Sequence, residues 1–201
     1  MTVVRQAVPI SEISAVAWKN GGGTTRTLAV EPENAGYDDF LWRVSIADVT
    51  ASGRFSCFPN MDRTIILLDG EGMVLAGGDG SEFALTTPFI PYTFRGETNI
   101  DGTLVAGPSR DFNVMTLRGL ASATVDCLRA ETWLPDQIDD AVLYCAHGSF
   151  QISANDGFAT AIAAGSVLRL SDLTPGGRLV PEQAGSVLIS VCIALTGHNR
   201  K

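Results

Sequence analysis

The segment FSCFPNMDRTIILLDGEGMVLAGGDG, residues 55–80, predicts the fold of the chain. Thr64–Leu68 is apolar and rich in β-branched residues, Asp69-Gly70 suits a tight turn with positive φ, and Met73–Ala76 is a second apolar run. Gly77–Gly80 then turns the chain again. This alternation of strands and tight turns is typical of an antiparallel barrel or sandwich.

The same pattern recurs later in the chain. Ile66–Gly70 aligns with Tyr144–Gly148, and Asp79-Gly80 then aligns with Asp156-Gly157 after a gap of one residue. This recurrence predicts two related β lobes. The alternative is that the two hairpins share only the glycines that tight turns commonly need.

The composition excludes several classes of protein. The 201 residues are 45% hydrophobic and 18% charged and include 21 glycines, which is typical of a globular, turn-rich β protein. The net charge of -8, without any basic run, argues against nucleic acid and anionic membranes, because phosphate binding needs clustered Lys and Arg. The N-terminus lacks the pattern of a signal peptide and no long apolar segment follows, so we expect a cytoplasmic protein.

Neither the cysteines nor the histidines form a recognisable catalytic or metal-binding motif. The cysteines are Cys57, Cys127, Cys145 and Cys192. Their wide spacing, without a CxxC pair, predicts free thiols in or near the core. His147 falls in a predicted hairpin turn and His198 in the tail, so both are expected at the surface and few candidates remain for a histidine-activated nucleophile.

Two predicted strands carry polar side chains on one face. In the strand predicted over Phe40–Val49, Arg43 and Ser45 alternate with apolar residues. Farther along, Asp111 and Asn113 alternate with apolar residues in the same way. A solvated or ion-paired surface arginine is the alternative interpretation for Arg43.

A run of glycines lies near the N-terminus. Asn20 is followed by Gly21, Gly22 and Gly23 in the segment WKNGGGTTR. Such a run marks a place where the backbone bends unusually or approaches another group closely. A phosphate loop is a weak interpretation, because neither a GKS or GKT ending nor GxGxxG before a helix is present.

Four segments resemble, in the same order, the signature segments of the HutD/Ves family of bicupins. They are WKNGGGTTR, FLWRVSIADV, GRFSCFPNMDRTIILLDGEG and SRDFNVMTLR, and they cover Trp18–Arg118. The second half resembles the family only in its strand pattern. The resemblance implies an all-β, cupin-type double β-barrel, a bicupin built from two related antiparallel lobes. It also implies an association with bacterial histidine utilisation and the binding of an intermediate such as formylglutamate or urocanate, without a definite enzymatic activity.

Metal-binding cupins carry an HxH pair and a glutamate seven residues before the hairpin glycine. Arg63 stands seven residues before Gly70 here. The HxH positions hold Ser56 and Phe58, or Cys57 and Pro59. An arginine repels a divalent cation and pairs well with a carboxylate, so we expect no metal and no other cofactor.

The first lobe, residues 1–120, is therefore predicted to hold a metal-free anion pocket, and residues 121–201 to form a structural lobe. The predicted ligand-binding residues are Asn20, Gly21, Gly22, Gly23, Arg43, Ser45, Arg63 and Asn113. The arginines would pair with a carboxylate, and the glycine segment would offer backbone donors at the mouth. Asp111 is expected to hold an arginine in place and Trp18 to form a wall, whereas Trp42 is expected in the core.

We expect a protein that binds a small anionic metabolite and has an accessory or regulatory role in histidine utilisation. Two alternatives from other classes are a cryptic enzyme acting on a small carboxylic acid and a structural dimer with an empty barrel. Turnover assays separate the first two, and ligand-dependent stabilisation separates both from the third. The sequence leaves the ligand and the oligomeric state open, a homodimer included.

Overall fold

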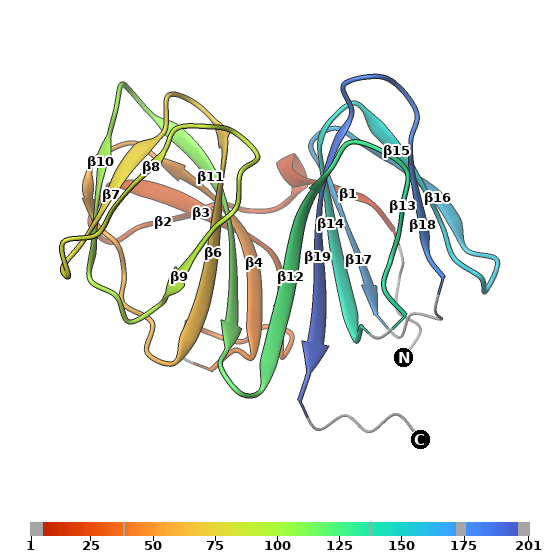
Figure 1. The fold of residues 1–201 in the computed structure, drawn as a ribbon, viewed down its shortest axis with the longest axis horizontal. Helices are drawn as coiled ribbons and strands as arrows, with labels where there is room; N and C mark the ends of the chain where they lie inside the picture. The colour runs from red at the N-terminus through yellow and green to blue at the C-terminus, as the bar shows by residue number, and fades with distance from the viewer. Residues whose placement is uncertain (1–5, 38, 137, 172–175, 197–201) are drawn as a thin grey trace. The chain divides into compact units, whose positions relative to one another are not determined.

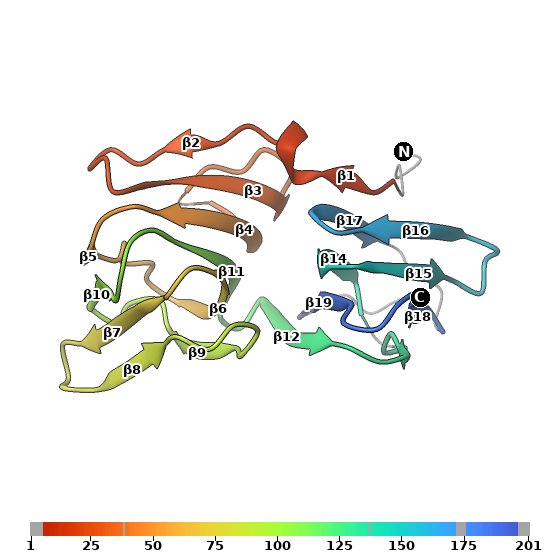
Figure 2. The ribbon, with the colours of Figure 1, turned by 90° about the horizontal axis from the view of Figure 1, so that it is seen from above.

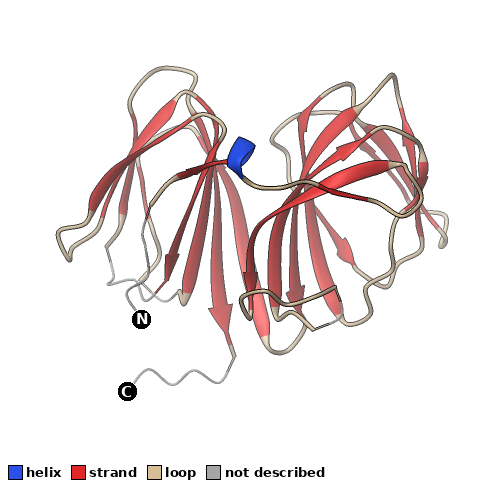
Figure 3. Ribbon diagram, turned by 180° about the vertical axis from the view of Figure 1, so that it is seen from behind, coloured by secondary structure: helices blue, strands red, loops and turns tan. Residues whose placement is uncertain are grey.

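The structure, a computed structural model, describes residues 6–37, 39–136, 138–171 and 176–196. Within these ranges the chain consists of strands and loops, with one short 3-10 helix, Ile10–Glu12 (Figure 3). The predicted all-β fold is confirmed. No helix in the described ranges has the length and hydropathy needed to cross a membrane.

The chain divides into two compact units. The N-terminal unit comprises residues 14–118, and the C-terminal unit comprises the described residues from 119 onward together with those before Ser14. The first segment belongs with the C-terminal unit because β1 (Val8–Pro9) pairs with β17 (Ser166–Ser171). The sequence analysis had placed this segment in the first lobe.

The N-terminal unit contains two antiparallel sheets (Figures 1 and 2). The six-stranded sheet has the order β2 (Val16–Ala17), β3 (Gly23–Glu31), β4 (Trp42–Val49), β11 (Ser109–Leu117), β6 (Met61–Asp69), β9 (Tyr92–Arg95). The four-stranded sheet has the order β5 (Gly53–Arg54), β10 (Ile100–Leu104), β7 (Met73–Gly77), β8 (Glu82–Leu85).

The closed barrel expected from the sequence is not formed. Among the described residues, no strand pairing joins the two sheets of the N-terminal unit. The strands at the sheet edges, β2, β5, β8 and β9, are only two to four residues long, which is too short for a continuous ladder around the unit. The unit is therefore a pair of open sheets.

The C-terminal unit repeats this strand order. Its larger sheet has the order β1, β17, β14 (Asp140–His147), β19 (Val187–Leu195), β12 (Ala121–Leu128), and its smaller sheet β13 (Thr132–Trp133), β18 (Arg178–Pro181), β15 (Ser149–Ser153), β16 (Ala159–Ala163). The series β12-β19-β14-β17 corresponds to β4-β11-β6-β9, and β13-β18-β15-β16 corresponds to β5-β10-β7-β8. Descent of the two units from one duplicated lobe stays a prediction.

The hairpin turns after β6 and β14 both require glycine. Gly70 has a φ of 88°, and a Cβ atom on it would lie 2.5 Å from the carbonyl oxygen of Pro108. Gly148 has a φ of 66°, and a Cβ atom there would collide with the Ser186 side chain. Both the left-handed conformation and the close packing therefore exclude a side chain.

The interiors of the two units differ in polarity. The C-terminal unit has a continuous apolar cluster that includes Leu143, Phe150 and Leu168. The N-terminal unit has apolar clusters too, and Trp42 is fully buried there, as expected. It also buries charged and polar side chains of its three central strands, namely Arg43, Ser45, Arg63, Asp111, Asn113 and Thr116.

Candidate functional site

Three neighbouring strands form the floor of the candidate site. β11 lies between β4 and β6, so its residues 110–116 have a partner on both sides. Met115 lies opposite Arg43 on one strand and Arg63 on the other. Asn113 lies opposite Ser45 on β4. Because side chains alternate along a strand, these residues face the same side of the sheet.

These side chains line a cavity of about 860 Å³ in the N-terminal unit. The predicted residues that line it are Trp18, Asn20, Gly22, Arg43, Ser45, Arg63, Asp111 and Asn113. Gly21 and Gly23, both within the described ranges, are not among the lining residues. The volume suits a small molecule, because small-molecule sites usually enclose roughly 300–1,000 Å³.

Arg63 is buried and held by two hydrogen bonds. Its Nη1 donates to the Ser56 carbonyl oxygen at 3.2 Å, and its Nη2 donates to Asn113 Oδ1 at 3.1 Å. Its Nε is buried without a hydrogen-bond partner among the described residues. Burial lowers the pKa of Arg63 to about 10, although the charge of Asp111 acts in the opposite direction. Arg63 therefore stays protonated at neutral pH.

Arg43 is buried in a similar way on the other side of β11. Its Nη2 donates to Thr27 Oγ1 at 2.6 Å, and its Nε also lacks a partner among the described residues. Neither Arg43 nor Arg63 forms an ion pair with another described residue. The two guanidinium groups therefore retain donor capacity for an anion.

Aromatic rings cover both arginines. The guanidinium carbon of Arg63 lies 5.5 Å from the ring centroids of Phe55 and Phe58 and 5.0 Å from that of Phe94, and the one of Arg43 lies 4.4 Å from the Tyr37 ring. Such contacts stabilise a cation and shield it from water. The sequence analysis did not identify these rings. A signal was available for two of them, because Phe55 and Phe58 stand beside Arg63 in the segment GRFSCFPNMDR.

Asp111 is the acidic member of the site and is almost completely buried, with 2% of its surface exposed. Asn113 Nδ2 donates to Asp111 Oδ1, while Asn113 Oδ1 accepts from Arg63. Asp111 is thus linked to Arg63 through the Asn113 side chain. Burial raises the pKa of Asp111 to about 7, although Arg63 and the hydrogen bond from Asn113 both act to lower it.

The amides of Gly21 and Gly22 do not act as the ligand donors that were predicted for them. Gly21 N donates to the Trp18 carbonyl oxygen at 3.0 Å, and Gly22 N donates to Asn20 Oδ1 at 3.0 Å. These amides are therefore used inside the turn and are not available to a ligand. Trp18 does form part of the wall, and its Nε1 donates to Thr25 Oγ1 at 2.7 Å.

The cavity does not fit a metal ion. Asp111 and Cys57 are the only acidic or thiol side chains among its lining residues, and no histidine lines it. Within the described ranges, no group of three His, Cys, Asp or Glu side chains is placed to hold a metal. Arg63, at the position of the cupin glutamate, places a positive charge in this cavity.

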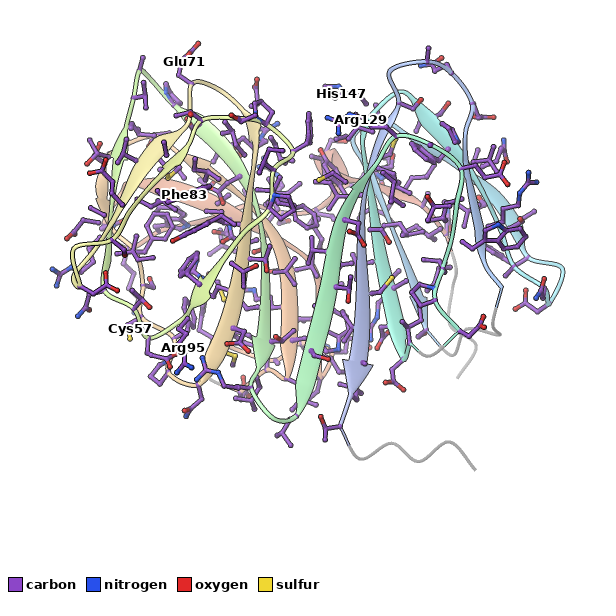
Figure 4. The ribbon with its side chains drawn as sticks, in the orientation of Figure 1. Cys57, Glu71, Phe83, Arg95, Arg129 and His147 are labelled. Atoms are coloured by element: carbon purple, nitrogen blue, oxygen red, sulfur yellow. The ribbon has the colours of Figure 1, made fainter. Side chains whose placement is uncertain are left out.

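Cys57 and His147 have different surroundings. Cys57 is exposed, contrary to the expected core position, and lies with Arg95 at the end of the N-terminal unit opposite Glu71 (Figure 4). His147 is exposed at the end of β14, as expected. His198 lies outside the described residues.

The C-terminal unit has no charged side chains at the positions that match the charged residues of this floor. Ala141 stands seven residues before Gly148, as Arg63 stands before Gly70. The ladder positions of Arg43, Arg63, Asp111 and Asn113 are taken by Thr124, Ala141, Leu188 and Ser190. The same strand order therefore supports a charged cavity in one unit and an apolar core in the other.

Sequence relatives identify the family. The HutD family profile matches residues 10–189. Protein Ves of Cronobacter sakazakii (strain ATCC BAA-894) is 34% identical over 137 residues, which cover 68% of this chain and 73% of that protein. An uncharacterized 21.2 kDa protein in the hutC 3′ region of Pseudomonas putida is 32% identical over 148 residues, which cover 74% of this chain and 77% of that protein.

Solved structures of similar fold agree with this family assignment. The conserved protein of unknown function PA5104 from Pseudomonas aeruginosa PAO1 has a TM-score of 0.85 at 29% identity, covering 94% of this chain and 98% of that one. HutD from Pseudomonas fluorescens SBW25 has a TM-score of 0.81 at 24% identity, covering 96% and 99%. A cupin 2 conserved barrel protein from Leptotrichia buccalis, with a TM-score of 0.59 at 8% identity over 94% and 96%, shares the fold alone. The chain therefore belongs to the HutD family.

Proposed function

We propose that the N-terminal unit binds a small carboxylate metabolite without a metal ion. The observation that carries this proposal is the burial of Arg43 and Arg63 on the cavity floor, where neither has an ion-pair partner among the described residues. A buried charge without a counter-ion is costly, and a carboxylate is the group that best matches a guanidinium. An anionic ligand therefore offsets a cost that the unliganded fold carries.

The proposed biological role is that of an accessory or regulatory protein of histidine utilisation, acting in the cytoplasm. The name of the Pseudomonas putida relative places it in the hutC 3′ region, and a structural neighbour is itself HutD. Formylglutamate and urocanate are the ligands we propose, held in the first of two cupin-type lobes.

A thermal-shift measurement with purified protein tests the binding proposal. Urocanate or formylglutamate at a hundred times its Kd should stabilise the fold by about 2.7 kcal/mol and raise Tm by about 5 to 10 °C. The methyl ester of urocanate is the matched control, because it keeps the ring and removes the charge. If neither acid raises Tm, or if the ester acts as well as the acid, the proposed pocket is wrong.

A further inference from the structure

Asp111 has a hydrogen-bonding capacity that the proposed carboxylate contacts do not use. Its Oδ1 accepts from Asn113, and no other described residue donates to this carboxyl group. Asp111 lines the cavity. The Nε atoms of Arg43 and Arg63 are inaccessible and have no hydrogen-bond partner within the described ranges, whereas the second oxygen of Asp111 is not sealed in this way. An acceptor therefore faces the space where a ligand would lie.

The position of this acceptor relative to Arg63 is fixed. Asn113 accepts from Arg63 with its oxygen and donates to Asp111 with its nitrogen, so its amide cannot turn over without losing both bonds. The acceptor and the guanidinium are consequently separated by one amide group. A ligand that pairs its carboxylate with Arg63 extends its opposite side toward Asp111.

The charges around Asp111 come from several strands. Arg63 faces it from β6, and Arg43 lines the same cavity from β4. Asp48 on β4 is neutralised by ion pairs with Arg26 and Arg110, each at 2.6 Å. The cross-strand neighbours of Asp111 are Ala47 and Leu67, and the facing sheet contributes Met73. Two exposed cations, Lys19 and Arg54, also line the cavity.

We propose that Asp111 is the specificity-determining residue of the pocket, an inference that rests on the carboxylate binding proposed above. Its ionised side chain accepts a hydrogen bond from an N–H or O–H group of the ligand, so the pocket selects a monocarboxylate that carries such a donor on the side opposite its carboxylate. The two buried guanidinium groups and the one buried carboxylate leave a single positive charge, which one ligand carboxylate neutralises. A second ligand carboxylate, such as that of formylglutamate, would face Asp111 as a like charge and would enter only with a proton, so of the two proposed metabolites the pocket should favour urocanate.

The test compares two acids that differ in one ring atom. Pyrrole-3-carboxylate and furan-3-carboxylate have the same shape and charge, but only the pyrrole has an N–H group across the ring from its carboxylate. By titration calorimetry at about pH 8, the pyrrole acid should bind at least about tenfold more tightly, because a hydrogen bond to a charged acceptor is involved. In Asp111→Asn the preference should fall to within about twofold, because the side chain no longer offers a charged acceptor there.

Asp62→Asn is the matched control. Asp62 lies next to Arg63 on β6 but points away from the cavity, where it pairs with Arg118 at 2.9 Å. This variant should keep the full preference for the pyrrole acid. A loss of preference in both variants would mean that any change of charge on the sheet has the effect, and the assignment to Asp111 would be wrong.

The unmodified protein supplies a test that does not depend on the folding of a variant. Lowering the pH from about 8 to about 5.5 protonates Asp111 while both ring acids stay ionised, so the preference should shrink. If both acids bind equally well at every pH, carboxylate binding stands and the role of Asp111 is refuted. If neither acid nor any metabolite binds, the proposed function itself fails and the role of Asp111 fails with it.

Discussion

Asp111 and Arg63 face the same cavity without forming an ion pair, because the side-chain amide of Asn113 lies between them and bonds to both. Arg63 Nη2 donates to Asn113 Oδ1 at 3.1 Å, and Asn113 Nδ2 donates to Asp111. The opposite charges are thus separated by an amide group, and their attraction does not fully offset the burial of the carboxyl group. The pKa of Asp111 is accordingly raised to about 7.

This relationship predicts how stability depends on pH. In the unfolded chain the carboxyl group ionises above its ordinary pKa of 3.8, whereas in the folded protein it keeps its proton up to about 7. The folded state binds more protons between these values, so the contribution of Asp111 to stability falls as the pH rises. Relative to Asp111→Asn, the parent should lose up to about 4 kcal/mol of unfolding free energy between about pH 4 and pH 8.

Urea unfolding of both proteins across this pH range measures the difference. The comparison cancels the opposite contribution of carboxylates such as Asp48, whose pKa is lowered by its hydrogen bonds to Arg110 and Arg26 despite partial burial. A difference between parent and variant that stays constant with pH would show that Asp111 titrates normally.

Arg43→Gln and Arg63→Gln should each weaken binding of urocanate. A hydrogen bond to a charged group contributes roughly 1.5 to 3 kcal/mol, so each substitution should raise Kd at least about tenfold. Arg178→Gln is the control, since this exposed arginine pairs with Glu131 in the C-terminal unit. Calorimetric titration gives the Kd values, and parent-like binding by both pocket variants would refute the site.

Gly70→Ala should destabilise the protein more than Gly80→Ala. The two glycines have nearly the same φ, 88° and 86°, so the backbone strain caused by alanine is the same. A Cβ atom at position 70 would also meet Pro108, whereas nothing lies within 4 Å of one at position 80. The extra overpacking cost should be about 1 to 3 kcal/mol, measured by urea unfolding. Equal losses of unfolding free energy in the two variants would mean that the β6–β7 turn can shift to accommodate the added methyl group.

Cys57 should be the fast-reacting thiol of the native protein. It is exposed and lines the cavity, whereas Cys145 and Cys192 are buried, and burial raises the pKa of Cys145 to about 11. Modification with a thiol reagent should give one rapid reaction, absent in Cys57→Ser, and four free thiols in denaturant. Bound urocanate should slow the rapid reaction. Unchanged reactivity with saturating ligand would place the ligand away from Cys57.

The long strands could be predicted from the sequence because alternation and glycine turns are local signals. β4, Trp42–Val49, lies within the predicted range Phe40–Val49, and the turn at Gly70 has the predicted positive φ. β9 begins at Tyr92, directly after Pro91, and the nearby Phe89 has a φ of 63°. Strands of two residues, such as β5, have no periodicity of their own and depend on their partners.

The site was predictable in part for the same reason. Alternation placed Arg43 with Ser45 and Asp111 with Asn113, but only the register of β11 between β4 and β6 brings these pairs together around Met115. The aromatic cover was not predictable from alternation because its rings come from other segments. The glycine turn was misassigned because the Asn20 side chain accepts from Gly22 within the turn.

The matching strand orders of the two units give this protein an internal reference. A ligand that occupies the charged cavity should slow amide hydrogen exchange in β4, β6 and β11. It should leave exchange unchanged in β12, β14 and β19, which follow the same order around an apolar core. Adding an acidic ligand can also change the pH and the ionic strength, and such changes alter hydrogen exchange in both sets of strands. The protection specific to binding can therefore be read as a difference between two halves of one molecule, in the same sample and at the same moment.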